Sequence, residues 1–402
     1  MAVQNRRLKI GIDFRVDEPR QGVGTAVLAL LHGLSHLQQT EQEYLLLVWD
    51  KHLEFFRPYV SGNCSLIGVP SPTPSSAAQW KARLRGFAFL QWLYTKVRPA
   101  SARLAASDGT AEGLGCDLVH FPSQIGYTTA LPTIYQPWDL QHRHHPEFFS
   151  PQDYRVRETQ YPEFCRRARF VCVQTEWTRQ DVIRQYDLEP EKVVVIRWGT
   201  AFEAYCQPSA ADILQVQEDL NLHEPFFLYP AITWPHKNHA VILRALAVLK
   251  QRHGRAPLVL FTGKPTDYQA TLQEMARDLK VDHAVRFLGF TSTNQIQVLF
   301  HLAQALLFPS LFEGLGLPIL EAFRAGLPVI SSNATVLSEV TGEAALLFDP
   351  ASPEQLADRM DELQSSPTLR QDLAERGKET LANYSIDETA RQFFSLYSKT
   401  AG

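Results

Sequence analysis

The sequence of 402 residues has a formal net charge of −4, with 45% hydrophobic and 20% charged residues. A nearly neutral chain has no global attraction for nucleic acid, and its length exceeds what one hydrophobic core usually supports, so we expect two domains. Its 5 cysteines form no Cys-x-x-Cys pair, which argues against a disulfide framework or a zinc site and fits a reducing cytoplasm.

Predicted strands and helices alternate along the chain, and this order favours parallel sheets with helices on both faces. Residues 1–7 lack the apolar core of a signal peptide, and no later apolar run approaches the roughly 20 residues that a membrane span needs. In the first half we expect a helix at 24–37 and strands at 8–13, 44–49, 116–121, 132–135, 170–173 and 192–196. In the second half we expect helices at 239–252 and from 318, and strands at 226–230, 258–263, 285–289, from 305, and at 328–331. The irregular stretch 200–212 is the expected domain boundary.

Gly22 and Gly24 follow the first predicted strand and open the first helix. Backbone N–H groups at such a turn can approach a phosphate or a sugar closely. A dinucleotide site has the same strand–turn–helix order, and Asp50 stands roughly where its ribose-binding acid would lie. That fingerprint is defective, because Val27 occupies the third glycine position and the loop 14–21 is too long for a tight Rossmann turn.

The stretch 79–104 interleaves basic residues with large apolar ones, and it lies in a span, 55–107, without any acidic residue. A basic amphipathic helix of this kind can lie on an anionic membrane surface. The alternative is a helix that faces the protein core with solvated arginines. The sequence leaves both interpretations open.

Three histidines, His142, His144 and His145, are crowded beside aromatic residues after the strand at 132–135. They could bind a metal, but neither acids nor cysteines accompany them at a suitable spacing, so we favour hydrogen-bonding roles. No Asp-x-Asp pair occurs in the chain. Because such a carboxylate pair usually holds the metal of a bound diphosphate, we expect chemistry without a metal.

Lys237 lies in a loop between a strand and a helix that Asn238 could cap with its side chain. A compact, mobile ammonium at this place could neutralise a diphosphate group. The alternative is an ordinary solvated charge.

Two carboxylates, Glu313 and Glu321, flank the segment Glu-Gly-Leu-Gly-Leu-Pro-Ile-Leu-Glu, which reads as a turn followed by a helix that ends at Gly326. Glu313 would lie at the carboxyl end of a strand, where open α/β sheets bind ligands. Glu321 would lie in the first helical turn, beside free N–H groups that can bind an anion. This spacing suits a nucleotide-sugar better than a lone metal, although the glycines could serve only the turns.

This segment resembles the Glu-x7-Glu signature of the family 4 retaining glycosyltransferases, Phe-Glu-Gly-Phe-Gly-Leu-Pro-x-x-Glu-Ala, followed by a small residue and Gly-x-Pro-Val. Leu315 replaces the usual Phe, and Ala-Gly-Leu-Pro-Val at 325–329 completes the match. The run Trp-Pro-His-Lys-Asn-His at 234–239 resembles a variant found in some members. The resemblance implies the α/β fold called GT-B, in which two Rossmann-like, doubly wound domains face each other across a cleft. Here they would span 1–200 and 201–384, with a C-terminal helix at 385–402 packing back onto the first.

The resemblance also implies roles for residues. Catalytic roles fall to Glu313, Lys237 and Asp139. Acceptor-side positions are Trp138, which stands where many members have a histidine, and His142. Donor-binding positions are Gly22, Gly24, Lys237, Gly289, Phe290, Glu313, Gly314, Leu315, Gly316 and Glu321. Members usually add an arginine before the lysine. Here Ala231, Ile232 and Thr233 precede it, so the second diphosphate cation is open, with His236 or a residue of the first domain as candidates.

The function implied is retaining transfer of a hexose, mannose or glucose, from a GDP- or UDP-linked nucleotide diphosphate sugar to a glycan or lipid-linked saccharide in polysaccharide biosynthesis. The mechanism would be front-face and metal-independent, with no cofactor beyond the sugar-nucleotide co-substrate. We expect a cytoplasmic protein, peripheral on the inner face of the membrane, without a nucleic-acid partner. Two alternatives stay open: another GT-B enzyme, such as a sugar-nucleotide epimerase or a disaccharide synthase, and an inactive nucleotide-sugar-binding scaffold.

Overall fold

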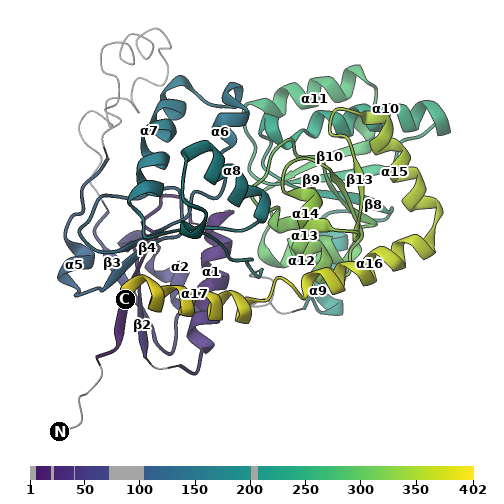
Figure 1. Ribbon diagram of the computed structural model, residues 1–402. Coiled ribbons are helices and arrows are strands. Elements are labelled where there is room, and N and C mark those ends of the chain that lie inside the picture. Colours follow the sequence, from purple (N-terminus) through teal and green to yellow (C-terminus); the bar gives the residue numbers. More distant parts are fainter. Residues whose placement is uncertain (1–5, 20–21, 40, 72–103, 201–206) are drawn as a thin grey trace. The chain divides into compact units, whose positions relative to one another are not determined.

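The computed structural model describes residues 6–19, 22–39, 41–71, 104–200 and 207–402 (Figure 1). The chain divides into two compact units. Unit 1 contains Met1–Val173, Asp181–Ile196 and Ala390–Gly402, and unit 2 contains Gln174–Gln180 and Arg197–Thr389. The sequence places the domain limits at 200 and 384, whereas the units change at 196/197 and 389/390.

Unit 1 contains a sheet of seven parallel strands in the order β3-β2-β1-β4-β5-β6-β7. The strands are β1 (Leu8–Asp13), β2 (Gln42–Trp49), β3 (Cys64–Val69), β4 (Leu118–Phe121), β5 (Thr133–Tyr135), β6 (Phe170–Val173) and β7 (Val193–Val195). The direction in which strands are added reverses between β1 and β4. In open α/β sheets a reversal of this kind leaves a crevice outside the carboxyl ends of the two strands.

The helices of the first half connect these strands. The α-helices are α1 (Val23–His36), α2 (Leu53–Phe56), α5 (Thr110–Gly113), α6 (Gln141–His144), α7 (Pro151–Arg167) and α8 (Glu176–Tyr186). Short 3₁₀ turns are η1 (Asp50–His52), η2 (Arg57–Tyr59), η3 (Pro146–Phe148) and η4 (Pro190–Lys192). α8 begins in unit 2, where the Glu339 carboxylate accepts the N–H groups of Glu176 and Trp177, both at 2.9 Å.

The last helix, α17 (Ile386–Ala401), packs its C-terminal part within unit 1 through a buried polar chain. Tyr397 Oη lies 2.9 Å from His120 Nδ1, and His120 Nε2 lies 2.7 Å from Gln136 Oε1. Burial lowers the pKa of His120 to about 3, so its ring is neutral. The Gln42 amide adds a hydrogen bond of 2.8 Å to the Phe394 carbonyl. These bonds attach the end of the chain to β2, β4 and the loop after β5.

Unit 2 contains a second parallel sheet, of six strands, in the order β10-β9-β8-β11-β12-β13. The strands are β8 (Phe226–Pro230), β9 (Leu258–Thr262), β10 (Val285–Gly289), β11 (Ala305–Phe308), β12 (Val329–Ser332) and β13 (Ala345–Phe348). Here the order reverses between β8 and β11.

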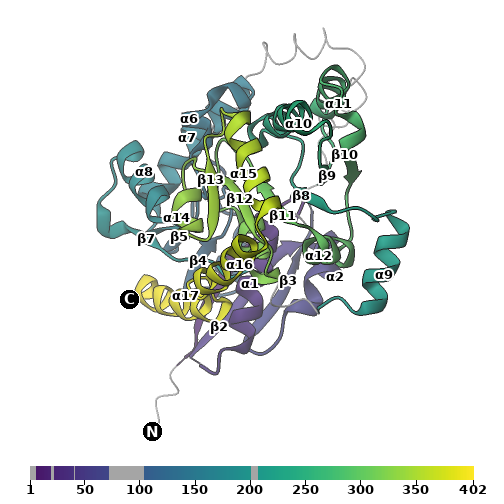
Figure 2. The ribbon, with the colours of Figure 1, turned by 90° about the vertical axis from the view of Figure 1, so that its right-hand side faces the viewer.

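Helices cover both faces of the second sheet. They are α9 (Ala210–Asp219), α10 (His239–His253), α11 (Tyr268–Asp278), α12 (Thr293–Leu302), α13 (Leu317–Ala325), α14 (Leu337–Thr341), α15 (Pro353–Ser365) and α16 (Pro367–Leu381), with 3₁₀ turns η6 (Pro235–Lys237) and η7 (Asp282–Ala284). α10 and α11 lie on one side of the sheet, and α12 and α13 lie on the other (Figures 1 and 2).

Two doubly wound parallel sheets confirm the predicted α/β class. Sequence patterns missed β3 and β13, and both are edge strands. An edge strand pairs on one side only, so its pattern is less apolar than that of a central strand. β3 shows this directly, because only its first and last residues, Cys64 and Val69, are buried.

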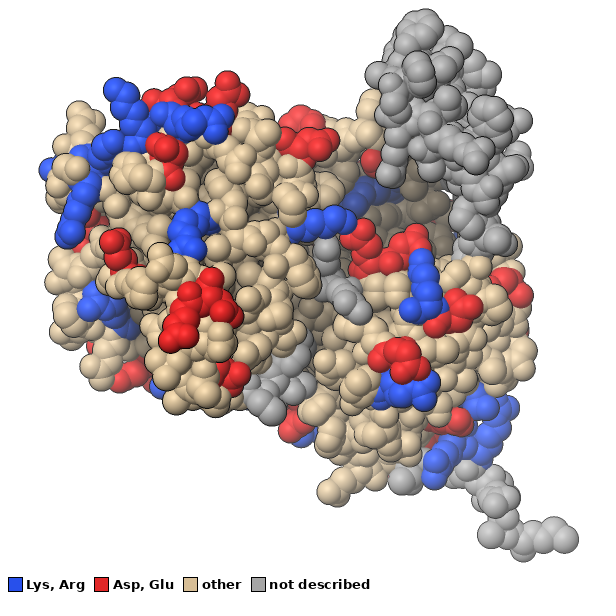
Figure 3. Space-filling model, turned by 180° about the vertical axis from the view of Figure 1, so that it is seen from behind, with Lys and Arg blue, Asp and Glu red and all other residues tan. Residues whose placement is uncertain are grey.

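The surface carries both signs of charge. Lys and Arg side chains are interspersed with Asp and Glu over the described part of the face shown in Figure 3. Within the described ranges, no helix has the length and apolarity to cross a membrane. The predicted membrane-contact stretch 79–104 lies, apart from Leu104, outside the described residues.

Candidate active site

Lys237 ends the turn η6, which connects β8 to α10. The next residue, Asn238, occupies the N-cap position of α10, but the predicted side-chain cap is wrong. Asn238 has a left-handed backbone (φ 56°), and its amide instead donates to the Pro309 carbonyl at 3.2 Å and the Pro350 carbonyl at 2.9 Å. Asn238 therefore ties the Lys237 loop to the loops after β11 and β13.

Glu313 lies in the loop between β11 and α13, as the predicted strand, turn and helix require. Gly316 precedes the helix with φ 84°, and a Cβ at this position would also lie 3.1 Å from a Leu337 methyl group. Gly326 ends the helix in the left-handed conformation, as predicted (φ 70°). Gly314 and Leu315 are buried, so these two positions offer a ligand mainly backbone groups.

Lys237 and Glu313 form an ion pair, with Nζ 2.6 Å from Oε1. Both side chains are largely buried, with 23% and 13% of their surface exposed. They meet because β8 and β11 are neighbours in the sheet and each residue lies in the loop after its strand. This is the reversal point of the sheet, where open α/β folds bind ligands.

A network of buried hydroxyls stabilises the loops that carry this pair. The fully buried Tyr229 donates to the Lys237 carbonyl at 2.7 Å, and its hydroxyl lies 3.3 Å from Ser310 Oγ. Ser332 Oγ donates to the Ser310 carbonyl at 2.6 Å, and the Leu311 N–H donates to the His236 carbonyl at 2.8 Å. Together these bonds fix the spacing between the loops that carry Lys237 and Glu313.

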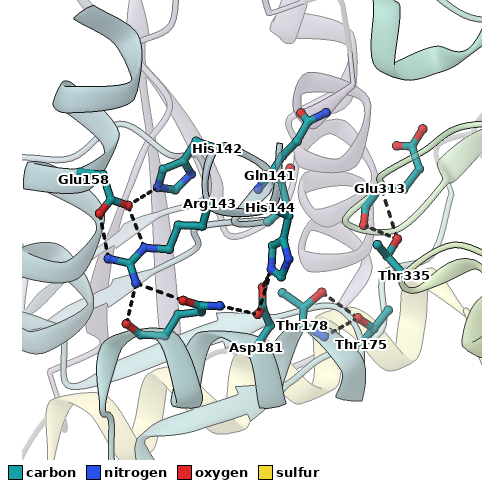
Figure 4. Close-up of polar contacts among 12 residues, drawn as sticks. Gln141, His142, Arg143, His144, Glu158, Thr175, Thr178, Asp181, Glu313 and Thr335 are labelled. Carbon is teal, nitrogen blue, oxygen red and sulfur yellow. Dashed lines mark hydrogen bonds and ion pairs between the residues drawn. The ribbon is translucent and has the colours of Figure 1, made fainter. Parts of the chain in front are cut away.

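Thr335 holds Glu313 from the loop after β12, as Figure 4 shows. The Glu313 N–H donates to Thr335 Oγ1 at 3.3 Å, and this hydroxyl lies 3.4 Å from the Glu313 carbonyl. Thr335 has φ 50°, an uncommon and strained conformation for a β-branched residue. Tyr229, Ser332 and Thr335 could not be predicted as site residues from local sequence patterns, because each acts through a contact with another loop.

Glu321 lies on α13 but beyond its first turn, which contains no acidic residue, so its predicted place beside the free N–H groups of that turn is wrong. Glu321 is half-buried, and burial raises the pKa of its carboxyl to about 7. The carboxyl is therefore largely protonated below neutral pH. A hydrogen-bond donor or a nearby positive charge would favour its ionised form.

Gly289 is the last residue of β10, and Phe290 follows it at the same edge of the sheet. The Gly263 N–H donates to the Gly289 carbonyl at 2.7 Å, which joins the ends of β9 and β10. Phe290 is 68% exposed, and Trp234, in the loop after β8, is 46% exposed. Their exposed ring faces are available for contact with a ligand at this edge.

In unit 1, Gly22 occupies the N-cap position of α1 with φ 47°. Gly24 approaches the backbone closely, because a Cβ there would lie only 1.7 Å from the Pro19 carbonyl oxygen. This contact is a structural reason for a glycine at position 24. The predicted contact of both glycines with a donor stays a prediction.

Trp138 and His142 are both buried within unit 1. Trp138 has φ 65°, and its indole N–H donates to the Pro122 carbonyl at 2.8 Å. His142 Nε2 lies 3.0 Å from the Glu158 carboxylate (Figure 4), and burial, assisted by Arg157, lowers the pKa of His142 to about 4. Neither side chain presents an accessible surface in this structure, so their acceptor role stays a prediction.

Asp139 and the other histidines have defined contacts. The Asp139 carboxylate accepts the Gln141 N–H at 3.0 Å. His144 contacts Asp181 at 2.8 Å, and His145 contacts Glu147 at 3.0 Å. His144 and His145 therefore hydrogen-bond to acidic residues, whereas the ring nitrogens of His142 have, among the described residues, only the ion-pair contact with Glu158.

The sequence of unit 2 matches a known family. Residues 211–380 match the family model described as glycosyl transferases group 1. Unit 2 is thus similar to this family over residues 211–380. The match contains Lys237, Glu313 and Glu321, the three charged residues of the candidate site.

Two curated relatives extend this likeness. The chain is 26% identical over 254 residues to the O-antigen chain mannosyltransferase B of Escherichia coli, which covers 63% of this chain and 66% of that protein. It is 28% identical over 242 residues to the D-inositol 3-phosphate glycosyltransferase of Corynebacterium diphtheriae, which covers 58% and 57%. Each match spans less than two thirds of the relative's length.

A solved structure shows the fold of the whole chain. The Anabaena protein Alr3699/HepE, in complex with UDP and glucose, superimposes with a TM-score of 0.71 at 18% identity, covering 98% of this chain and 100% of the other. This likeness, with the two parallel sheets, confirms the predicted pair of Rossmann-like domains found in GT-B glycosyltransferases.

Proposed function

We propose that the protein is a family 4 retaining glycosyltransferase, which transfers mannose or glucose from a nucleotide diphosphate sugar to a glycan or lipid-linked saccharide in polysaccharide biosynthesis. The observation that carries this proposal is the Lys237–Glu313 pair at the reversal point of the second sheet. The likeness to an O-antigen mannosyltransferase supports the polysaccharide context.

The donor would occupy the loops around this pair. Its diphosphate would bind the Lys237 ammonium and the backbone N–H groups at the start of α13, because a helix N-terminus attracts anions. Glu313 would then leave Lys237 and accept hydroxyls of the hexose, while Glu321 would accept the ribose hydroxyls. Gly289 and the exposed Phe290 would contact the base. Gly22 and Gly24 would contribute backbone N–H groups to the donor from unit 1.

The chemistry follows from the charge that develops on the leaving group. The bond between the anomeric carbon and the diphosphate oxygen breaks, and its electron pair leaves with the diphosphate, which Lys237 stabilises. The acceptor hydroxyl oxygen bonds to the anomeric carbon on the same face, and its proton passes to the departing diphosphate oxygen. The anomeric configuration is retained, and no metal is used. Asp139 is proposed to orient the acceptor.

Lys237→Met and Glu313→Gln test these roles directly. Transfer from GDP-mannose and UDP-glucose to a lipid-linked glycan should fall about 100-fold or more in each variant, the usual effect of losing one group that stabilises transition-state charge. Asp358→Asn, which removes an exposed partner of Arg252 in the same unit, should leave transfer unchanged. If both site variants fold and transfer sugar as fast as wild type, these assignments are wrong. Incubation with each donor alone would reveal an epimerase.

The proposal places the enzyme in the cytoplasm, with peripheral membrane contact through 79–104. A vesicle-sedimentation assay with anionic lipids tests this contact, and Arg→Gln changes within the stretch should abolish it.

A further inference from the structure

A pocket with a volume of about 220 Å³ lies entirely in unit 1. Its lining includes Asp13 and Arg15 at the end of β1, Trp49 at the end of β2, and Phe121 at the end of β4. The pocket therefore lies at the reversal point of the first sheet, the position that the Lys237–Glu313 pair has in the second.

One guanidinium and two carboxylates determine the charge of this pocket. Arg15 Nη2 donates to Asp13 at 2.7 Å and Arg15 Nε donates to the same carboxylate at 2.9 Å, while Nη1 pairs with Asp108. The Arg15 side chain is only 8% exposed, whereas Asp108 is 50% exposed. Among the residues that line the pocket, no other Lys or Arg occurs. The lining thus carries one net negative charge, and its cation is already engaged.

Aromatic rings form the apolar part of the pocket. The Arg15 guanidinium carbon lies 5.4 Å from the centre of the Trp49 ring and 5.5 Å from that of Tyr127. These contacts hold both rings against the charged group. Ile125, also in the lining, is 60% exposed and offers an apolar surface to a ligand.

The Tyr127 hydroxyl is a buried polar group that no described residue satisfies. The neighbouring Asp13 carboxylate and, more strongly, burial raise the pKa of this phenol, yet no hydrogen bond of good geometry joins the two groups. A buried hydroxyl without a partner destabilises the protein, and a ligand hydroxyl in the pocket would remove this cost.

We propose that this pocket binds an uncharged pyranose ring of the acceptor and disfavours acceptors that carry a phosphate. Apolar C–H faces of a sugar can pack on Trp49 and Ile125, while its hydroxyls meet Tyr127 and the exposed Asp108 carboxylate. A phosphate would meet a negative lining whose guanidinium is already paired. The inference rests on the proposed function. A preference for an uncharged acceptor agrees with the name of the O-antigen mannosyltransferase and differs from that of the D-inositol 3-phosphate glycosyltransferase.

Ligand-observed NMR on the full chain, with methyl mannoside, methyl glucoside and D-inositol 3-phosphate as probes, tests the selectivity. At least one neutral glycoside should bind at least tenfold more tightly than the phosphate. Equal binding of the phosphate, or binding of the phosphate alone, would overturn the proposal.

Two variants locate the binding. Trp49→Ala should abolish glycoside binding, and Tyr127→Phe, which removes the hydroxyl group and leaves the ring in place, should weaken it about fivefold.

A third variant tests the charge of the pocket. Asp108→Asn removes a negative charge and releases part of Arg15, so it should increase binding of D-inositol 3-phosphate. Asp117→Asn, which removes a partner of the exposed Arg6 elsewhere in unit 1, should change neither. Unchanged glycoside binding in folded Tyr127→Phe and Trp49→Ala would refute the assignment.

Titration with UDP and GDP separates this inference from the proposed function. The pocket variants should keep nucleotide affinity, because Lys237 and Glu313 belong to unit 2. If nucleotides fail to bind while neutral glycosides still bind through Tyr127, the proposed function fails and the pocket assignment stands. If nucleotides bind and the glycosides do not, the pocket assignment fails and the proposed function stands.

Discussion

Lys237 Nζ lies 2.6 Å from Glu313 Oε1, although 76 residues separate them in the sequence. Each carries a predicted role toward a different part of the same ligand, the lysine toward the diphosphate and the glutamate toward the sugar. In the free protein each neutralises the other. A donor must therefore break this ion pair before both residues can act on it.

This competition predicts opposite effects of one substitution. Glu313→Gln should tighten binding of the free nucleotide diphosphate about fivefold, because it releases Lys237 from an ion pair worth ~1 kcal/mol. The same variant should lose sugar transfer. Calorimetric titration with UDP and GDP measures the affinity, and Lys237→Met should weaken it. Weaker nucleotide binding by Glu313→Gln would show that the pair does not oppose the ligand.

Glu321 makes stability depend on pH. Burial raises its pKa to about 7 from the ordinary 4.5, so folding favours the protonated form. This contribution to the free energy of unfolding is complete below pH 4.5 and is lost as pH rises through 7. It amounts to at most about 3 kcal/mol, since each pKa unit corresponds to ~1.4 kcal/mol. Glu321→Gln should therefore raise Tm at pH 8, and the gain should shrink toward pH 5.

The same carboxylate is proposed to bind ribose, so Glu321→Gln should also weaken donor binding at pH 8. Glu274→Gln, an exposed glutamate on α11, serves as the control and should alter neither quantity. Thermal unfolding with and without nucleotide measures both effects. A stabilised variant with unchanged donor affinity would leave Glu321 without a ligand role.

Tyr229→Phe removes one buried hydroxyl that bonds the Lys237 carbonyl. We expect a loss of about 1 kcal/mol in the free energy of unfolding and a fall in kcat of about tenfold, since the loops of Lys237 and Glu313 lose their fixed spacing. Tyr44→Phe is the matched control. It removes an equally buried hydroxyl, bonded to Gln42 at 3.0 Å in unit 1, and should cost stability without changing kcat.

Thr335 offers three graded substitutions. Thr335→Ser keeps the hydroxyl that contacts Glu313 and should retain activity, whereas Thr335→Val keeps the shape and should lose about tenfold in kcat/KM. Thr335→Gly relieves the positive φ, so it should preserve or raise Tm while losing activity. Steady-state kinetics and thermal unfolding separate the two effects. Full activity in Thr335→Val would show that the shape of Thr335, and not its hydroxyl, matters.

Phe290 is tested by deletion of its ring. Phe290→Ala should weaken nucleotide binding about tenfold and leave Tm unchanged, because the side chain is 68% exposed and loses little packing. Leu214→Ala on α9, where the side chain is 61% exposed in the same unit, is the control for general surface effects. Equal nucleotide affinity in both variants would remove Phe290 from the site.

Much of the candidate site could be predicted from the sequence because its information is local. The strand, the glycine turn and the helix around Glu313 follow from residues within about twenty positions, and Gly326 ends the helix through its own conformational freedom. The same kind of local rule predicted that the Asn238 side chain caps α10, and this prediction is wrong. Two carbonyls from other loops, which no local pattern reveals, bind its amide instead.

The sequence by itself determined the central strands and the charged residues that follow them, but not the edge strands β3 and β13. The tertiary structure decided which of these residues meet. Lys237 reaches Glu313 because β8 and β11, which are far apart in the sequence, are neighbours in the sheet. Packing also buries Trp138 and His142, which the resemblance places on the acceptor side. Strand order and burial depend on contacts between distant segments, which are stabilised by the packing of the whole core and are not encoded in any short stretch of chain.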